Sequence, residues 1–327
     1  MVSPILVNSV LLNPSDIAWR NIISELVHVF SEPYTDAPTQ EVLRREKFVS
    51  ELETLVSGAS WDLWNSFTQA VPKTSELLKE FWGSQQNGKA IFIIDGLSLR
   101  EMPYLLQEAR ERGFYINGAR VSGSELPSET TTFAKSIGFT QRSLLENNRT
   151  SSEHVLPNAT TQSVDLPWID CVGLIRSEPN WIMWHSCFDD LIHLYSEPGK
   201  GLRDLFTKGE QHFTSDDFWK LVNKLATGRR VVITSDHGYA ATGEYANVNE
   251  EQTEYLRAIY KSQRFSKSDG VGSQWIPPID VHLDSDHGSF RYVLGRRKWK
   301  SSGGYPTLAH GGLSFMETFV PFIELSL

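Results

Sequence analysis

Cysteine is scarce in this chain of 327 residues, which contains only two. Cys171 and Cys187 stand apart, and neither belongs to a Cys-x-x-Cys pair. A disulfide framework and a thiolate zinc knuckle both need closely spaced or more numerous cysteines, so the sequence argues against both. We expect two buried structural thiols in a reducing cytosol.

Long apolar runs and an excess of basic residues are also missing. No segment reaches the roughly 20 apolar residues that a membrane helix needs. The N-terminal stretch has neither a basic lead nor a small-residue cleavage site, so we expect no signal peptide, no membrane partner and a cytoplasmic location. The net charge of −9 argues against a general nucleic-acid scaffold. It leaves room for an enzyme, because carboxylates are needed to hold metal ions.

Hydrophobic periodicity divides the chain into two regions. Residues 1–85 show helical spacing and predict an N-terminal helical attachment. Residues 86–327 alternate strand and helix patterns, which predicts an α/β fold with a mainly parallel sheet between helices. Two stretches that fit the sheet poorly, 140–164 and 244–305, are expected to be insertions over its carboxyl edge. Strands are predicted at 89–94, 115–121, 166–175, 180–187, 230–235 and 318–327, and helices at 99–113 and 218–225.

Acidic residues end the two clearest buried strands. Asp95 and Gly96 follow Lys-Ala-Ile-Phe-Ile-Ile, and Asp236, His237 and Gly238 follow Arg-Val-Val-Ile-Thr-Ser. An aspartate at this position can simply cap the next helix. A carboxylate beside an imidazole is also a ligand pair for zinc or manganese. The second motif therefore predicts a metal site more strongly than the first.

Other candidate residues are ambiguous when each is taken alone. Asp189 and His193 are four residues apart, so on a helix they share a face and could chelate one ion. His310 lies in a glycine-rich turn near the C-terminus. Thr130 and Thr131 enter a predicted helix after Pro-Ser-Glu, where hydroxyls are often caps. The functional interpretation is a threonine nucleophile where helix amides favour phosphate.

The order of these motifs is more specific than any one of them. IIDGL, LPSETTT, FDDLIH, VVITSDHGY and LAHGGLSFMETFVP occur in that order between about residue 89 and the end of the chain. This order resembles the alkaline-phosphatase superfamily. Within it, the chain is most similar to the PglZ-domain family of bacterial BREX-type phage-defence islands and some response regulators. The helices of residues 1–85 lie outside the resemblance.

The resemblance implies a site with two divalent metals, zinc first and manganese second. One metal would be held by Asp95, Thr130, Asp236 and His237, with Thr130 as the nucleophile, and the other by Asp189, His193 and His310. Thr131 is the alternative nucleophile. Asp190 stands where the pattern more usually has a histidine, which affects the details of the second metal site. A second Asp-His-Gly, Asp286–Gly288, does not follow a buried strand and is expected to be a loop.

The substrate implied by the resemblance is a nucleotide or oligonucleotide phosphodiester, with other defence-system proteins as partners. Tyr239 could stack a base, and Arg100 or the basic residues of 296–300 could hold phosphates. No arginine is close to Thr130 in sequence, so a diester is expected to be preferred over a doubly charged monoester. A phosphomonoesterase and a catalytically weak scaffold subunit are the alternatives. A formylglycine sulfatase is excluded because no cysteine has the Cys-x-Pro-x-Arg context.

Overall fold

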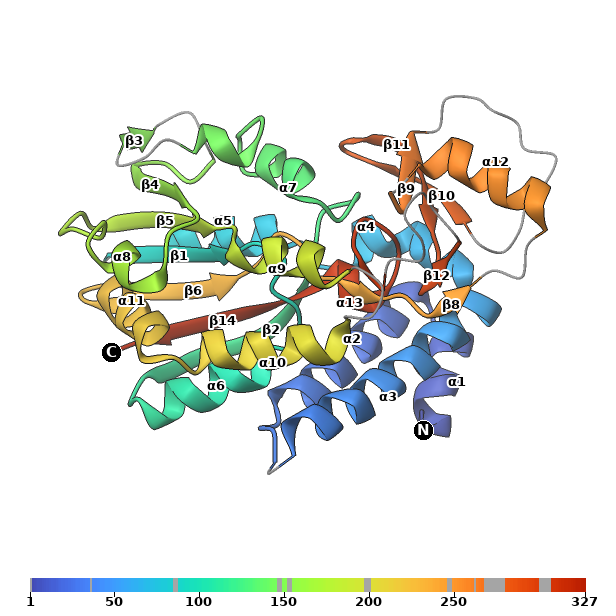
Figure 1. Cartoon of the computed structure of the whole chain (residues 1–327), viewed down its shortest axis with the longest axis horizontal. Helices are drawn as coiled ribbons and strands as arrows, with labels where there is room; N and C mark the ends of the chain where they lie inside the picture. The colour runs from blue at the N-terminus through green and yellow to red at the C-terminus, as the bar shows by residue number, and fades with distance from the viewer. Residues whose placement is uncertain are drawn as a thin grey trace.

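A seven-stranded mixed sheet lies at the centre of the molecule, in the strand order β2-β14-β6-β1-β5-β4-β3 (Figure 1). The structure is a computed structural model that describes residues 2–35, 37–84, 88–145, 149–151, 155–196, 201–245, 249–261, 263–267, 280–299 and 307–327. Parallel pairing joins β4, β5, β1 and β6. The strand β14 is antiparallel to both β6 and β2, so the predicted mainly parallel α/β sheet is confirmed. The strands of this sheet are β1 (Lys89–Ile94), β2 (Tyr115–Gly123), β3 (Arg149–Ser151), β4 (Ala159–Val164), β5 (Asn180–His185), β6 (Arg230–Thr234) and β14 (Phe319–Ser326).

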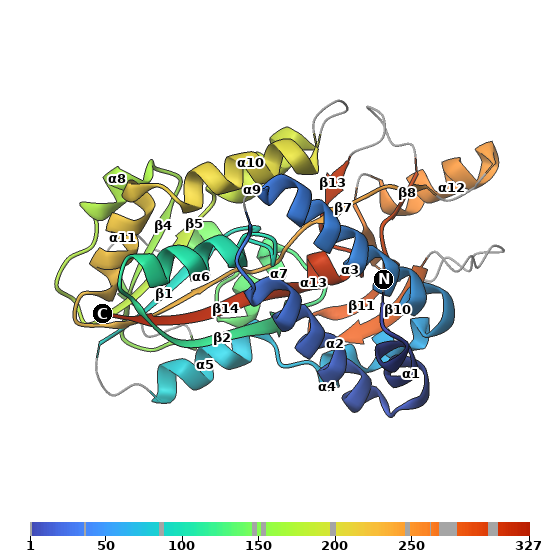
Figure 2. The same ribbon diagram turned by 90° about the horizontal axis from the view of Figure 1, so that it is seen from below.

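Helices cover both faces of the sheet because the central strands are apolar on both sides. In β1, Phe92 and Ile94 join one hydrophobic cluster, while Ile91 and Ile93 join another. The first face is covered by α6 (Met102–Glu111), α8 (Trp168–Val172), α9 (Cys187–Tyr195), α10 (Leu202–Phe213) and α11 (Asp216–Ala226). The second face is covered by α5 (Thr74–Ser84) and α7 (Thr130–Ser136). Figure 2 shows α10 and α11 on one side of the sheet and α5 on the other.

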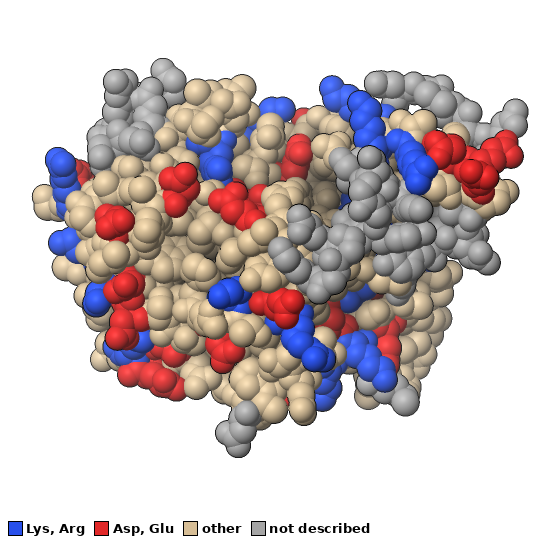
Figure 3. All heavy atoms as spheres, in the orientation of Figure 1, with Lys and Arg blue, Asp and Glu red and all other residues tan. Residues whose placement is uncertain are grey.

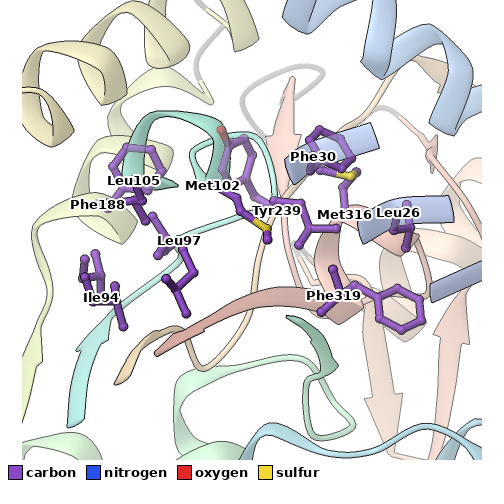
Figure 4. Close-up of a cluster of buried hydrophobic side chains, with 14 of the residues drawn as sticks. Leu26, Phe30, Ile94, Leu97, Met102, Leu105, Phe188, Tyr239, Met316 and Phe319 are labelled. Carbon is purple, nitrogen blue, oxygen red and sulfur yellow. The ribbon is translucent and has the colours of Figure 1, made fainter. Parts of the chain in front are cut away.

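The N-terminal region is helical, as predicted, and shares its core with the sheet. Its further elements are α1 (Pro4–Leu12), α2 (Ser15–Ser31), α3 (Pro38–Ala59), η1 (Trp61–Ser66) and α4 (Phe67–Ala70). Leu26 and Phe30 of α2 lie in the same buried cluster as Met102, Met316 and Phe319 (Figure 4). The helices are therefore packed into the same hydrophobic core as the strands, while the boundary at residue 85 stays a prediction.

Buried ion pairs also tie α3 to the sheet portion. Arg100, which follows β1, donates two hydrogen bonds of 2.8 Å to the carboxylate of Glu46. Arg296 binds the same carboxylate and that of Glu53. Burial alone would raise the pKa of Glu46, but the two guanidinium groups outweigh it and lower the pKa to about 2. Glu46 is therefore a charged group in the core that depends on its partners.

We expect Glu46→Ala to lower the free energy of unfolding by about 3–5 kcal/mol, because it leaves two buried arginines without their shared carboxylate. Urea denaturation monitored by circular dichroism measures this loss. The matched control is Asp16→Ala, which removes an ion pair with Arg20 whose side chains are 57% and 73% exposed. The control should cost less than about 1 kcal/mol. Equal losses in the two variants would contradict the assigned importance of the buried network.

A smaller antiparallel sheet contacts the loop that precedes Thr130 and belongs to the predicted insertion of residues 244–305. It consists of β9 (Phe265–Lys267), β10 (Asp280–Ser285) and β11 (Gly288–Val293), next to α12 (Glu250–Tyr260). Short pairs join β7 (Ala240–Ala241) to β13 (Leu308–Ala309) and β8 (Glu244–Tyr245) to β12 (Arg297–Lys298). The remaining elements are η2 (Arg142–Leu144) and α13 (Phe315–Thr318).

Two predictions about the sheet were wrong. Residues 166–175 were predicted as a strand but contain α8, whose Trp168 and Cys171 are buried while Ile169 is exposed. The apolar residues there form one face of a helix. In so short a segment, the spacing of apolar residues does not distinguish a helix from a buried strand. The 140–164 stretch was predicted to lie outside the sheet, yet it contains β4, which pairs in parallel with β5. The sequence of β4 contains Thr, Gln and Ser side chains and therefore lacks the apolar run that predicts a buried strand.

Among the described residues, no helix is both long and apolar enough to span a membrane.

Candidate metal centre

All of the predicted ligands converge at the carboxyl edge of the sheet. Asp95 follows β1, Asp236 and His237 follow β6, and Asp189 lies in the first turn of α9 after β5. Parallel strands end at the same edge, so residues far apart in sequence meet there. The remaining predicted residues are brought in by α7, α9 and the turn after β13, and they are Thr130, His193 and His310.

The first group surrounds the hydroxyl of Thr130. This hydroxyl donates a hydrogen bond of 3.2 Å to Asp95 Oδ1 and lies 3.4 Å from His237 Nε2. The same His237 nitrogen is 3.5 Å from Asp95 Oδ1 and 3.5 Å from Asp236 Oδ2. Thr130 is thus placed with the predicted ligands of the first metal.

The second group lies directly beside the first. His193 Nε2 is 3.2 Å from Asp189 Oδ2, and His310 Nε2 is 3.9 Å from Asp189 Oδ1. The rings of His237 and His310 stack with centroids 4.2 Å apart. Among the residues that the structure describes, ligand atoms within 4.8 Å of one another form two sets, Asp189 with His193 and His310, and Asp95 with Asp189 and His237. Asp189 belongs to both sets, so it lies between the two predicted metal sites.

The residues present fit divalent metals on two grounds. Within the described chain, Asp189 Oδ1 and Asp236 Oδ2 are buried and accept no hydrogen bond, which is costly for a carboxylate without a cation. Burial, together with the charges of Asp236 and Asp189, raises the pKa of Asp95 well above its ordinary value. A cation among these carboxylates would offset both effects. The imidazole and carboxylate donors are those that zinc and manganese accept.

Backbone carbonyls orient the rings of His237, which is buried, and His310, which is partly buried. His237 Nδ1 is 3.0 Å from the carbonyl of Gly238, and His310 Nδ1 is 3.4 Å from that of Ser128. Donation from Nδ1 leaves Nε2 of each ring free to act as a metal ligand. Burial and the neighbouring His237 lower the pKa of His310 to about 4, so its ring is neutral at physiological pH.

The loop that carries Thr130 is fixed from two sides. On one side, the amide of Gly311 donates to Ser128 Oγ at 3.2 Å. On the other, Ser285 of the β10–β11 hairpin donates to the carbonyl of Leu126 at 3.0 Å. The position of Thr130 therefore depends on the turn that holds His310 and on the β10–β11 hairpin.

The second Asp-His-Gly serves this loop and does not join either metal group in the described chain. His287 lies at the turn of the hairpin, with Nε2 3.8 Å from Glu125 Oε2. Asp286 is exposed. The expected loop role of this motif agrees with its position.

The residues proposed for base stacking and phosphate binding are placed elsewhere. Tyr239 is fully buried, donates to Glu101 at 2.9 Å and packs under the Arg100 guanidinium. Arg100 and Arg296 are bound to buried glutamates, and Lys298 is buried as well. The predictions for these four residues were wrong because their side chains are buried and structural. Arg297 is half-buried, so its role in phosphate binding stays a prediction, and Lys300 lies outside the described residues.

Asp190 also lies apart from both metal groups in the described chain. Its carboxylate accepts a hydrogen bond of 3.3 Å from Ser186 and is otherwise on the exposed side of α9. Asp190 replaces the histidine that is more usual at this position in the family pattern, and Asp189, His193 and His310 are still grouped as predicted.

Arg142 is a site residue that the sequence reasoning missed. Its Nη1 lies 2.7 Å from Asp95 Oδ2, on the opposite oxygen from the one that Thr130 contacts. The guanidinium is about one-third exposed. Arg142 is distant from Thr130 in sequence but close to it in the structure. The prediction that a doubly charged substrate would be disfavoured therefore no longer follows.

The fold and this site define an α/β protein with a candidate two-metal centre at the carboxyl edge of its sheet. No protein-family model and no curated protein matches the chain. Among solved structures, murine ectonucleotide pyrophosphatase/phosphodiesterase 5 is similar with a TM-score of 0.43 and 10% identity, covering 72% of this chain and 87% of that one. Phosphonoacetate hydrolase from Sinorhizobium meliloti 1021, in complex with phosphonoformate, gives a TM-score of 0.42 and 14% identity, covering 72% and 89%. Similarity at this level does not transfer an activity.

Proposed function

We propose that the chain is a metal-dependent phosphoester hydrolase of the alkaline-phosphatase superfamily, with Thr130 as its nucleophile. The observation that carries this proposal is the convergence of Thr130 with two adjoining sets of metal-ligand side chains. Asp95, Asp236 and His237 would hold one ion, and Asp189, His193 and His310 the other. Bound there, two divalent cations would supply positive charge that stabilises the attacking and leaving oxygens of phosphoryl transfer.

The chain's own residues then account for the covalent step. Thr130 Oγ1 attacks phosphorus, the threonine–phosphorus bond forms, and the bond to the ester oxygen breaks as the alcohol leaves. Water hydrolyses the resulting phosphothreonine and regenerates the hydroxyl. The contacts of Thr130 with Asp95 at 3.2 Å and His237 at 3.4 Å orient Oγ1 for this attack.

The resemblance to the PglZ-domain family favours nucleotide phosphodiesters as substrates and a role in anti-phage defence or signalling. A cytoplasmic location remains a prediction from sequence. Acidic and basic side chains are interspersed on the face drawn in Figure 3. Such a surface supports a small substrate better than a long polynucleotide, which binds along a basic stripe.

A phosphomonoester is the second candidate, and Arg142 favours it. A monoester dianion carries one more charge than a diester, and an arginine beside the nucleophile can bind that charge. Arg142 meets this description because its guanidinium contacts Asp95 next to Thr130.

The test is hydrolysis by the protein after loading with zinc or manganese. We expect turnover of bis(p-nitrophenyl) phosphate or p-nitrophenyl phosphate that is lost on chelation and restored by added metal. The ratio of the two kcat/KM values assigns the ester class. A folded protein that binds no metal, or hydrolyses neither ester with metal bound, would favour a scaffold role.

A further inference from the structure

A polar pocket of about 310 Å³ lies beside the predicted nucleophile site. It is formed by η2 and the residue that follows it, the end of β4 and the start of α9, through Arg142, Ser143, Leu145, Ser163, Val164, Asp165 and Ser186. Arg142 connects it to Asp95 at 2.7 Å. Since β1, β4 and β5 are parallel neighbours, the pocket and Asp95 share the carboxyl edge of the sheet.

The chemistry of the pocket suits hydroxyl groups. Asp165 is exposed at its rim, where a carboxylate can accept hydrogen bonds from an alcohol. Ser186 is buried and donates to Asp190, so its oxygen can still accept one. None of the described residues that line the pocket is aromatic. A nucleobase would therefore find no stacking partner among them.

Arg142 separates this pocket from the nucleophile. Arg142 donates a hydrogen bond to Asp95 and also lines the pocket, so its guanidinium group adjoins both. An ester whose phosphorus is next to Thr130 would place a non-bridging oxygen within reach of this guanidinium. The alcohol portion would then extend into the pocket.

We propose that this pocket is the subsite for the alcohol portion of the substrate, and that this portion is a hydroxylated, non-aromatic group such as a sugar or polyol. Arg142 binds the adjoining phosphoryl oxygens. The inference rests on the proposed function and narrows it, because a sugar next to the phosphate is compatible with a nucleotide as well as with a simple sugar ester.

The test compares glycerol 3-phosphate with propyl phosphate, which share a primary alkyl leaving group and differ in the hydroxyls of the alcohol. In the zinc-loaded protein we expect kcat/KM to be about tenfold higher for the glycerol ester, the size of one hydrogen bond to a charged group. Asp165→Ala should remove most of this ratio. Asp170→Ala is the matched control, since Asp170 is exposed on the neighbouring helix α8 and does not line the pocket. Arg142→Ala should lower kcat/KM for both esters.

Binding supplies a readout that does not need turnover. Calorimetry with zinc-loaded Thr130→Ala should show about tenfold tighter binding of glycerol 3-phosphate than of propyl phosphate, and Asp165→Ala in that background should abolish the difference. Equal affinities for the two compounds, or a ratio that Asp165→Ala does not change, would overturn the subsite. Loss of hydrolysis alone would count against the proposed function, while the binding ratio would still decide the subsite.

Discussion

Thr130→Ala is expected to reduce kcat for phosphoester hydrolysis by about a thousandfold or more, because it removes the atom that attacks phosphorus. Metal content should remain close to that of the unmodified protein. The Asp and His ligands of both groups come from β1, α9, β6 and the turn after β13, and none of them depends on the threonine for its position. Initial rates and elemental analysis on the same preparation measure the two effects.

Thr131→Ala is the matched control. Thr131 is the adjacent residue of α7 and is exposed, so its loss should leave kcat nearly unchanged. Thr130→Ser keeps a hydroxyl at the same place and should retain measurable turnover. Full activity in Thr130→Ala would show that Thr131 or a water molecule attacks directly. A larger loss in Thr131→Ala would move the nucleophile by one residue.

His237→Ala is expected to lose most of the bound metal and nearly all activity, whereas His287→Ala should keep both. The ligand atom of His237 lies close to those of Asp95 and Asp189, and its Nε2 is also 3.4 Å from Thr130 Oγ1. The His287 ring lies near Glu125, in the loop before Thr130, and its backbone amide donates to Ser285. Elemental analysis after dialysis against zinc-free buffer compares the two variants.

Each variant replaces the histidine of an Asp-His-Gly motif, so the two changes are alike in local sequence and differ in position. A modest loss of kcat in His287→Ala with normal metal content is compatible with its contact to the loop. Equal losses of metal, with both variants folded by circular dichroism, would show that the wrong motif was assigned to the site.

The central strands and the grouping of the candidate ligands could be predicted because several of their signals are local. A continuous apolar run ending in an acid marks β1 and β6, and both strands lie where the sequence placed them. Once parallel strands are adjacent, Asp95 and Asp236 must meet at one edge. The family resemblance that the motif order indicates then implied that Asp189 and His310 lie at the same edge, and the structure groups them there.

Contacts made by loops could not be predicted in this way. Arg142 lies twelve positions after Thr130 in a short 3-10 helix, and nothing in its neighbouring sequence indicates that it meets Asp95. The same limit applies to Arg100, which follows Asp95 closely but turns away to Glu46. Side-chain direction at such positions is decided by the partner, and the partner comes from a distant element.

The ion pairs of α3 have a consequence for how this architecture can vary between related chains. Arg100 donates to Glu46 and also to the carbonyl of Tyr239, two residues after His237. A chain that kept the same metal ligands without these helices would need to replace Arg100 and Arg296, or obtain acidic partners from another segment or subunit. Loss or exchange of the helices should therefore coincide with changes at both arginines. We expect α3, Arg100 and Arg296 to be kept or lost together among related chains.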